Sequence, residues 1–105
     1  MGPGGLAVED VKDTLDALAC GRVATLLVRP FAADSRVALF GAGPTDVYPD
    51  HDAAALSSAP VRSGRLIDVA VRSALLSGAH VRVIPQSTPA EPVGGIGALC
   101  RYAAP

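Results

Sequence analysis

Aromatic residues and cysteines are scarce in this chain of 105 residues, which has no tryptophan, two tyrosines, two phenylalanines and two cysteines. So few rings argue against a nucleic-acid interface that works by stacking bases on side chains. Two cysteines are too few for a disulfide framework. Cys20 and Cys100 both lie in apolar stretches, so we predict two small buried residues with free thiols.

An excess of charge and a long apolar run are also missing. Nine basic and ten acidic residues give a net charge of -1, whereas proteins that bind phosphate backbones usually carry a basic excess. No run of about 18 apolar residues predicts a membrane span, and no charged segment followed by an apolar one predicts a signal peptide. We therefore expect a cytoplasmic protein.

Hydrophobic residues, in contrast, make up 50% of the chain. A chain of this length buries roughly 65% of its unfolded surface on folding, which is enough for a core without cross-links. The Gly/Pro-rich residues 1–5 predict a flexible N-terminal arm. Residues 6–105 are predicted to form a single α/β domain.

Apolar periodicity predicts two main helices. Val8, Val11, Leu15 and Leu18 share one face of the first, which ends at Gly21. The second runs from 64 to 77. Strands are predicted at 23–28, 36–40, 79–84 and 98–102, with a short strand at 47–48 and one helical turn at 52–56.

The order of these elements predicts a three-layer α/β/α sandwich around a mixed, mostly four-stranded sheet. Residues 23–28 are continuously apolar, which is typical of a strand buried on both faces. The strand at 36–40, the second helix and the strand at 79–84 form a unit that permits a parallel crossover.

Two loops could carry cofactor or metal chemistry. Residues 41–46 begin like a dinucleotide-binding loop, but the third glycine and the following helix are missing, so a tight turn is the better interpretation. Residues 49–52 place Asp50, His51 and Asp52 side by side, where neighbours rarely face one metal ion. We predict no cofactor and no metal site.

No pattern predicts a catalytic site. The serines lack the turn of a nucleophile elbow, and Glu9, Asp13 and Asp16 are interpreted as one solvated face of the first helix. The chain is therefore predicted not to be an enzyme. A small hydrolase or transferase using His51 or a cysteine stays open as an alternative.

Three arginines suggest a small basic patch around the second helix. Arg62, Arg65 and Arg72 could contact RNA phosphates, because guanidinium groups match phosphate geometry. The alternative is a solvated helix face on which Asp68 bridges the arginines.

The C-terminal segment carries a family resemblance. Residues 93–102, Val-Gly-Gly-Ile-Gly-Ala-Leu-Cys-Arg-Tyr, resemble the Gly-Gly-Ile-Gly, apolar and Arg-Tyr ending of the third domain of archaeal and eukaryotic class 1 release factors. Pelota-type ribosome-rescue factors have a related ending. Residues 16–28 and 67–85 are similar to helix and strand segments of bacterial relatives of that family.

The resemblance implies a non-catalytic α/β/α domain, similar to kink-turn RNA-binding ribosomal proteins, that contacts a translation GTPase or the ribosome. It also implies that Gly95, Ile96, Gly97, Arg101 and Tyr102 take part in partner binding. The Gly-Gly-Gln motif of peptide release lies in a preceding domain of the family, and the only glutamine here is Gln86. Release activity is therefore not expected, and a small RNA-binding domain is the alternative function.

Overall fold

The structure is a computed structural model that describes residues 7–29, 36–57, 59–85 and 94–102. The predicted N-terminal arm lies outside these residues. The elements are β1 (Ala7–Val8), α1 (Val11–Ala19), β2 (Val23–Val28), β3 (Val37–Phe40), β4 (Val47–Tyr48), α2 (His51–Ala54), β5 (Arg62–Arg65), α3 (Leu66–Leu76), β6 (His80–Val83) and β7 (Ile96–Cys100). Within the described part, no helix combines the length and the apolar composition that crossing a membrane requires.

A mixed sheet of four strands is confirmed. Its order is β1-β7-β2-β6, with β2 and β6 parallel and β7 antiparallel to both β1 and β2. The strand predicted at 98–102 is an interior strand of this sheet, but it begins at Ile96 and ends at Cys100. The parallel partner of β6 is β2, whereas the sequence predicted the strand at 36–40.

That strand, β3, belongs to a second, three-stranded antiparallel sheet of order β4-β3-β5. Gly64 and Arg65 were predicted at the start of a helix, but they end β5, and α3 begins at Leu66. Residues 62–65 show no apolar alternation because β5 is an exposed edge strand. Backbone pairing with β3 holds it in place.

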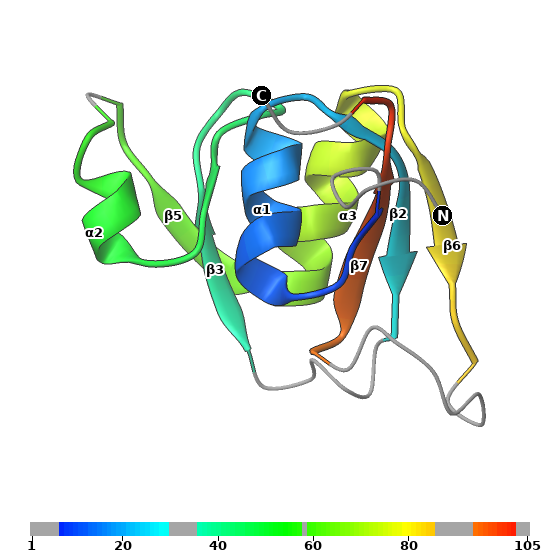
Figure 1. The fold of residues 1–105 in the computed structure, drawn as a ribbon. Helices are drawn as coiled ribbons and strands as arrows, with labels where there is room; N and C mark the ends of the chain where they lie inside the picture. The colour runs from blue at the N-terminus through cyan, green and yellow to red at the C-terminus, as the bar shows by residue number, and fades with distance from the viewer. Residues whose placement is uncertain (1–6, 30–35, 58, 86–93, 103–105) are drawn as a thin grey trace.

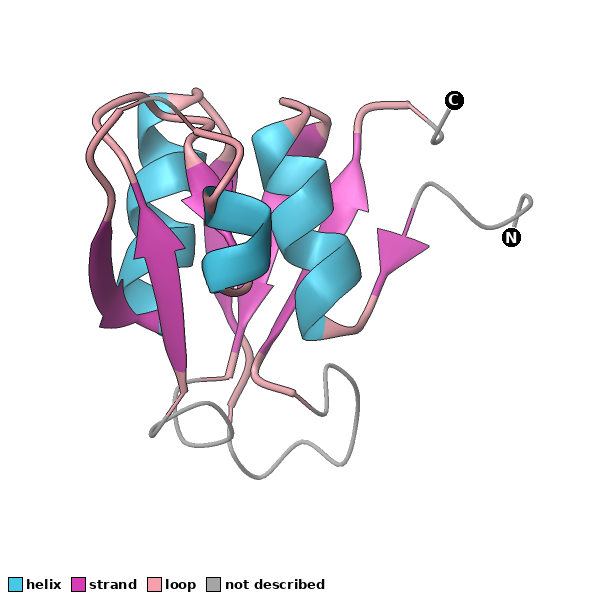
Figure 2. Ribbon diagram, turned by 90° about the vertical axis from the view of Figure 1, so that its left-hand side faces the viewer, coloured by secondary structure: helices cyan, strands magenta, loops and turns pink. Residues whose placement is uncertain are grey.

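The two long helices lie between the two sheets (Figures 1 and 2). α1 packs on β7 and β4, and α3 packs on β2 and β6 as well as on β3 and β5. The described layers are therefore sheet, helices, sheet, and not the predicted α/β/α order. The pattern of β2 gives the physical reason: Val23, Leu26 and Val28 are buried, but Thr25 and Leu27 on the opposite face are only partly covered. The predicted burial of this strand on both faces is wrong.

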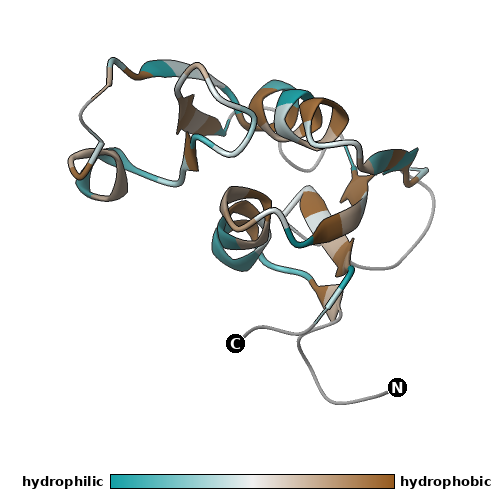
Figure 3. Cartoon of the chain, turned by 90° about the horizontal axis from the view of Figure 1, so that it is seen from above, coloured by the Kyte–Doolittle hydropathy of each residue, from teal (hydrophilic) through white to brown (hydrophobic). Residues whose placement is uncertain are grey.

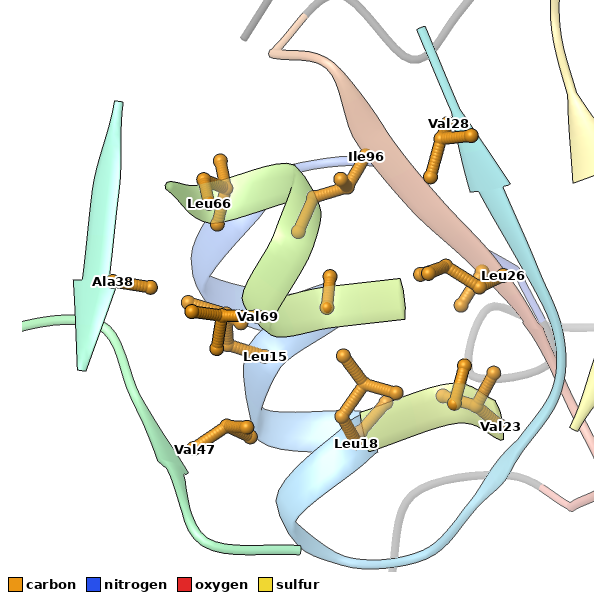
Figure 4. Close-up of a cluster of buried hydrophobic side chains, with 14 of the residues drawn as sticks. Leu15, Leu18, Val23, Leu26, Val28, Ala38, Val47, Leu66, Val69 and Ile96 are labelled. Carbon is orange, nitrogen blue, oxygen red and sulfur yellow. The ribbon is translucent and has the colours of Figure 1, made fainter. Parts of the chain in front are cut away.

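The core fills the space between the sheets (Figure 4). Leu15 and Leu18 enter it from α1, and Leu66 enters it from α3, each about 1% exposed. Leu26 and Ile96 meet them from the mixed sheet. Each such side chain contributes roughly 1.5–3 kcal/mol on burial. Figure 3 shows that α1 keeps its hydrophilic residues on the side away from this core.

A side-chain cap fixes where α1 begins. The carboxylate of Asp10 accepts a hydrogen bond from the backbone N–H of Asp13 at 2.7 Å, so α1 starts at Val11. Val8, predicted on this helix, instead pairs with Ala98 in the sheet. Gly21 follows α1 with φ +69°, as its predicted role as a helix stop requires.

Candidate interaction surface

The glycine-rich segment turns tightly into β7. Gly95 has φ +101°, a conformation that favours glycine, and its carbonyl oxygen accepts a hydrogen bond from the N–H of Arg29 at 2.7 Å. A Cβ atom on Gly94 would lie 2.9 Å from the side chain of Val11. Ile96 then enters the core with 0% exposure. These residues place β7 between its neighbours, and Ile96 has no accessible surface for a partner.

Arg101 forms hydrogen bonds within its own chain. Its Nε donates to the carbonyl oxygen of Val23 at 3.1 Å, and its Nη2 donates to that of Ser77 at 3.3 Å. Ser77 caps the C-terminus of α3, where a positive charge is favourable. Tyr102, the next residue, is 52% exposed. Among the five residues that the resemblance implicates, Tyr102 therefore presents a large accessible side chain, whereas the guanidinium of Arg101 is engaged within the chain.

On β1, β7 and β2, the side of the mixed sheet away from α1 and α3 carries small or apolar residues. We call this side the outer face and define it by residues that share a face in the strand register: Ala7, Thr25, Leu27, Gly97 and Leu99. Leu99 is 44% exposed. A cavity of about 130 Å³ opens on this face, bounded in part by Leu27, Gly97 and Leu99. The outer face thus presents apolar side chains on and beside β7.

The outer face was not predicted from the sequence. An apolar run such as residues 23–28 is equally compatible with burial on one face or on two. Thr25, a polar residue inside that run, was the one signal that favoured a single buried face.

The three arginines of the predicted basic patch are separated. The guanidinium carbon of Arg72 lies 5.2 Å from the ring centre of Phe40, and its Nη2 donates to the carbonyl oxygen of Ala42 at 3.0 Å. Arg62 pairs with Phe40, and so shares its face of the small sheet, whereas Arg65 lies on the opposite face. Arg72 therefore acts as a clamp between α3 and a loop, while Arg62 and Arg65 stay exposed.

The loop at 41–46 is a closed turn, as predicted. The N–H of Gly41 donates to the backbone oxygen of Asp46, and the N–H of Gly43 donates to the Asp46 carboxylate, both at 2.8 Å. The Asp46 carboxylate thus accepts the backbone N–H that a bound phosphate group would need. The Ser73 hydroxyl, fully buried on α3, donates to the carbonyl oxygen of Pro44 and fixes the loop.

The other sequence candidates do not converge. Asp50 caps the short helix α2, and His51 is its first, exposed residue. The described residues include no group of three His, Cys, Asp or Glu side chains that could hold a metal ion. Cys20 is exposed rather than buried, because it follows α1 on its solvent side, and Cys100 is partly buried. Glu9 precedes α1, so it does not share a helix face with Asp13 as predicted.

Comparisons with known proteins do not assign the chain to a family. No protein-family model matches the chain, and no curated protein matches it significantly.

Proposed function

We propose that this chain is a non-catalytic binding module of the release-factor and Pelota third-domain type, which docks to a translation-related protein or to the ribosome. The observation that supports this most directly is the position of β7. The glycine-led segment forms an interior strand, and it exposes Leu99 on a face that no described helix covers. The proposed kinship with kink-turn RNA-binding ribosomal proteins rests on the sequence resemblance.

Binding through the outer face has a simple energetic basis. Leu99 is exposed and Leu27 is partly exposed on this face, next to the buried Gly97, so a partner that covers the two leucines removes apolar surface from water. Each Å² of apolar surface so covered contributes about 25 cal/mol before the costs of association. Tyr102, two residues beyond the end of β7, presents a further accessible side chain, a ring with a polar end.

Co-sedimentation with purified ribosomes of the host tests the proposal. We expect the wild-type chain to sediment with ribosomes and Leu99→Glu to lose most of this binding, because a carboxylate would be desolvated at the interface. Leu56→Glu is the matched control. Leu56 is 93% exposed and follows α2, which lies beyond the small sheet (Figure 1). The proposal fails if the chain binds neither ribosomes nor any translation component of the host lysate.

RNA binding is the second candidate, and one arrangement favours it. Arg65 pairs with Val37, and the backbone oxygen of the preceding Arg36 accepts a hydrogen bond from the N–H of Leu66 at 2.9 Å. Arg36 and Arg65 are thus close together and exposed at one end of the small sheet. We expect this site to bind RNA with an affinity that falls steeply with salt and with Arg36→Ala plus Arg65→Ala. Filter binding across a salt series measures both effects, and an absence of binding at low salt would reject this candidate.

A further inference from the structure

Strand β6 is an open edge of the mixed sheet. In the described residues its one neighbour is β2, which it pairs in parallel from Thr25–His80 to Val28–Val83. The N–H of Ile84, just beyond β6, donates to the backbone oxygen of Val28 at 2.7 Å. Because backbone groups alternate in direction along a strand, those of His80 and Arg82 also point towards β2. The N–H and C=O groups of Val81 and Val83 therefore point away from the sheet.

The side chains of β6 divide by chemistry between the two faces. Arg82 pairs with Leu27 and His80 with Thr25, so both lie on the outer face, and both are exposed. No hydrogen bond or ion pair engages Arg82 within the described part of the chain. Val81 packs against the core on the opposite face, and Val83 beyond it is 63% exposed. Among the residues that the structure describes, this edge thus combines backbone groups without a partner, a cation without an ion pair and an exposed valine.

We propose that β6 receives an extended segment of a partner protein by strand addition. The segment has an acidic side chain level with Arg82 and apolar, β-branched side chains level with Val81 and Val83. The backbone groups of the two valines specify an extended chain, because they match the spacing of a strand. Alternation then puts the acidic group on the outer face and the apolar groups against Val83. This inference deepens the proposed function, on which it rests, by naming the element that the partner contributes.

A second copy of this chain is a poor occupant of the same edge. An antiparallel pair of β6 strands uses the outward groups of both valines in each copy when Val81 of one copy faces Val83 of the other. This register places Arg82 directly opposite Arg82 of the second copy. Like charges directly opposite each other destabilise a strand pair. An acidic segment reverses the sign of that interaction, so charge complementarity selects a different protein.

The length of the edge limits the occupant. Pro85 follows Ile84 and has no N–H to donate, so added pairing ends at about Val83. Such a short pairing is weak alone, and the outer face beside it supplies further contact surface for the same partner. A short apolar–acidic–apolar segment next to a complementary surface is therefore the predicted docking element.

A titration followed by NMR tests the proposal with a capped peptide whose central residues are Val-Glu-Val. We expect shifts centred on the amides of Val81, Arg82 and Val83, with a dissociation constant on the order of 1 mM. Arg82→Glu should weaken binding about tenfold, and should bind the Val-Lys-Val peptide in its place. Arg62→Glu makes the same charge change on β5, the exposed edge of the other sheet. This variant should bind the Val-Glu-Val and Val-Lys-Val peptides with the same affinities as the wild-type chain.

Removal of a single edge donor gives an independent test. Val83→Pro deletes an N–H that the β2–β6 pairing does not use, so the fold should persist and the peptide should no longer bind. Circular dichroism checks the fold, and Val83→Ala, which keeps the N–H, should retain most of the binding.

The proposal is overturned if the peptide does not bind, if its shifts map elsewhere, or if Arg82→Glu and Arg62→Glu have equal effects. Ribosome co-sedimentation separates this failure from that of the proposed function. A chain that binds ribosomes equally well as wild type and as Val83→Pro retains the function and rejects strand addition at β6. A chain that binds the peptide but no translation component rejects the translation role alone.

Discussion

The two sheets enclose the same pair of helices but differ in strand length and in the contacts that hold them. The mixed sheet pairs strands of four to six residues, apart from the two-residue β1, and fills its inner face with buried leucine, isoleucine and valine. The small sheet has one two-residue strand and a polar edge strand, and side chains of α3 tie its loop. Ala38 and Val47 of the small sheet also enter the core, so the comparison shows that apolar burial holds both sheets and that polar contacts from α3 add to it at the small sheet.

A truncation in the centre of the mixed sheet should have the largest effect. Leu26→Ala removes a fully buried side chain and leaves a cavity between β2 and the helices. We expect the free energy of unfolding to fall by about 2–5 kcal/mol in a urea titration. Leu27→Ala, on the outer face of the same strand, should cost clearly less. Equal losses at the two positions would show that both faces are covered.

The hydrogen bond that ties α3 to the loop of the small sheet should have the next largest effect on stability. Ser73→Ala deletes the buried hydroxyl that bonds the carbonyl oxygen of Pro44. We expect a loss of about 1–2 kcal/mol, because a part-buried hydrogen bond between α3 and the loop is removed. Ser63→Ala on the exposed strand β5 should change the stability by less than about 0.5 kcal/mol. A neutral Ser73→Ala would mean that polar contacts do not hold the small sheet.

Substitution of Gly21, which ends α1 with a positive φ, should have a smaller effect on stability. A Cβ on Gly21 would meet nothing within 4 Å, so Gly21→Ala changes only the cost of its positive φ. We expect a loss of about 1 kcal/mol in thermal unfolding. Gly21→Asn should lose less, since asparagine tolerates this conformation. If alanine proved neutral, the turn from α1 into β2 would have another conformation.

The smallest effect is expected at the exposed thiol. Cys20→Ser should leave the free energy of unfolding within about 0.5 kcal/mol of wild type. A thiol reagent should label Cys20 in the folded chain faster than the partly buried Cys100. Faster labelling of Cys100 would contradict the position of β7 inside the sheet.

The sequence predicted those parts of the fold that depend on local pattern. Apolar periodicity located α3 from Leu66 onward, and the strand predicted at 98–102 overlaps β7 at residues 98–100. The start of α1 was misplaced because Val8 fits the apolar spacing of a helix, whereas the Asp10 cap decides the boundary.

The layer order could not be predicted in the same way. It depends on which distant strands pair, and the apolar run at 23–28 does not reveal that one of its faces stays open. β5 was missed because its stability comes from backbone pairing with β3, which leaves no apolar pattern in residues 62–65. For the candidate site the sequence indicated β7 itself, but the outer face appears only when β1, β7 and β2 are aligned in register.

The central claim is that β7 lies inside the mixed sheet with its outer face open. Thiol labelling of Leu99→Cys and Ala98→Cys, each with Cys20→Ser and Cys100→Ser, tests it most directly. These adjacent positions are 44% and 0% exposed. We predict that the folded Leu99→Cys variant reacts rapidly and that Ala98→Cys reacts only on unfolding. Equal protection of both positions would mean that the outer face is covered, and would contradict this account.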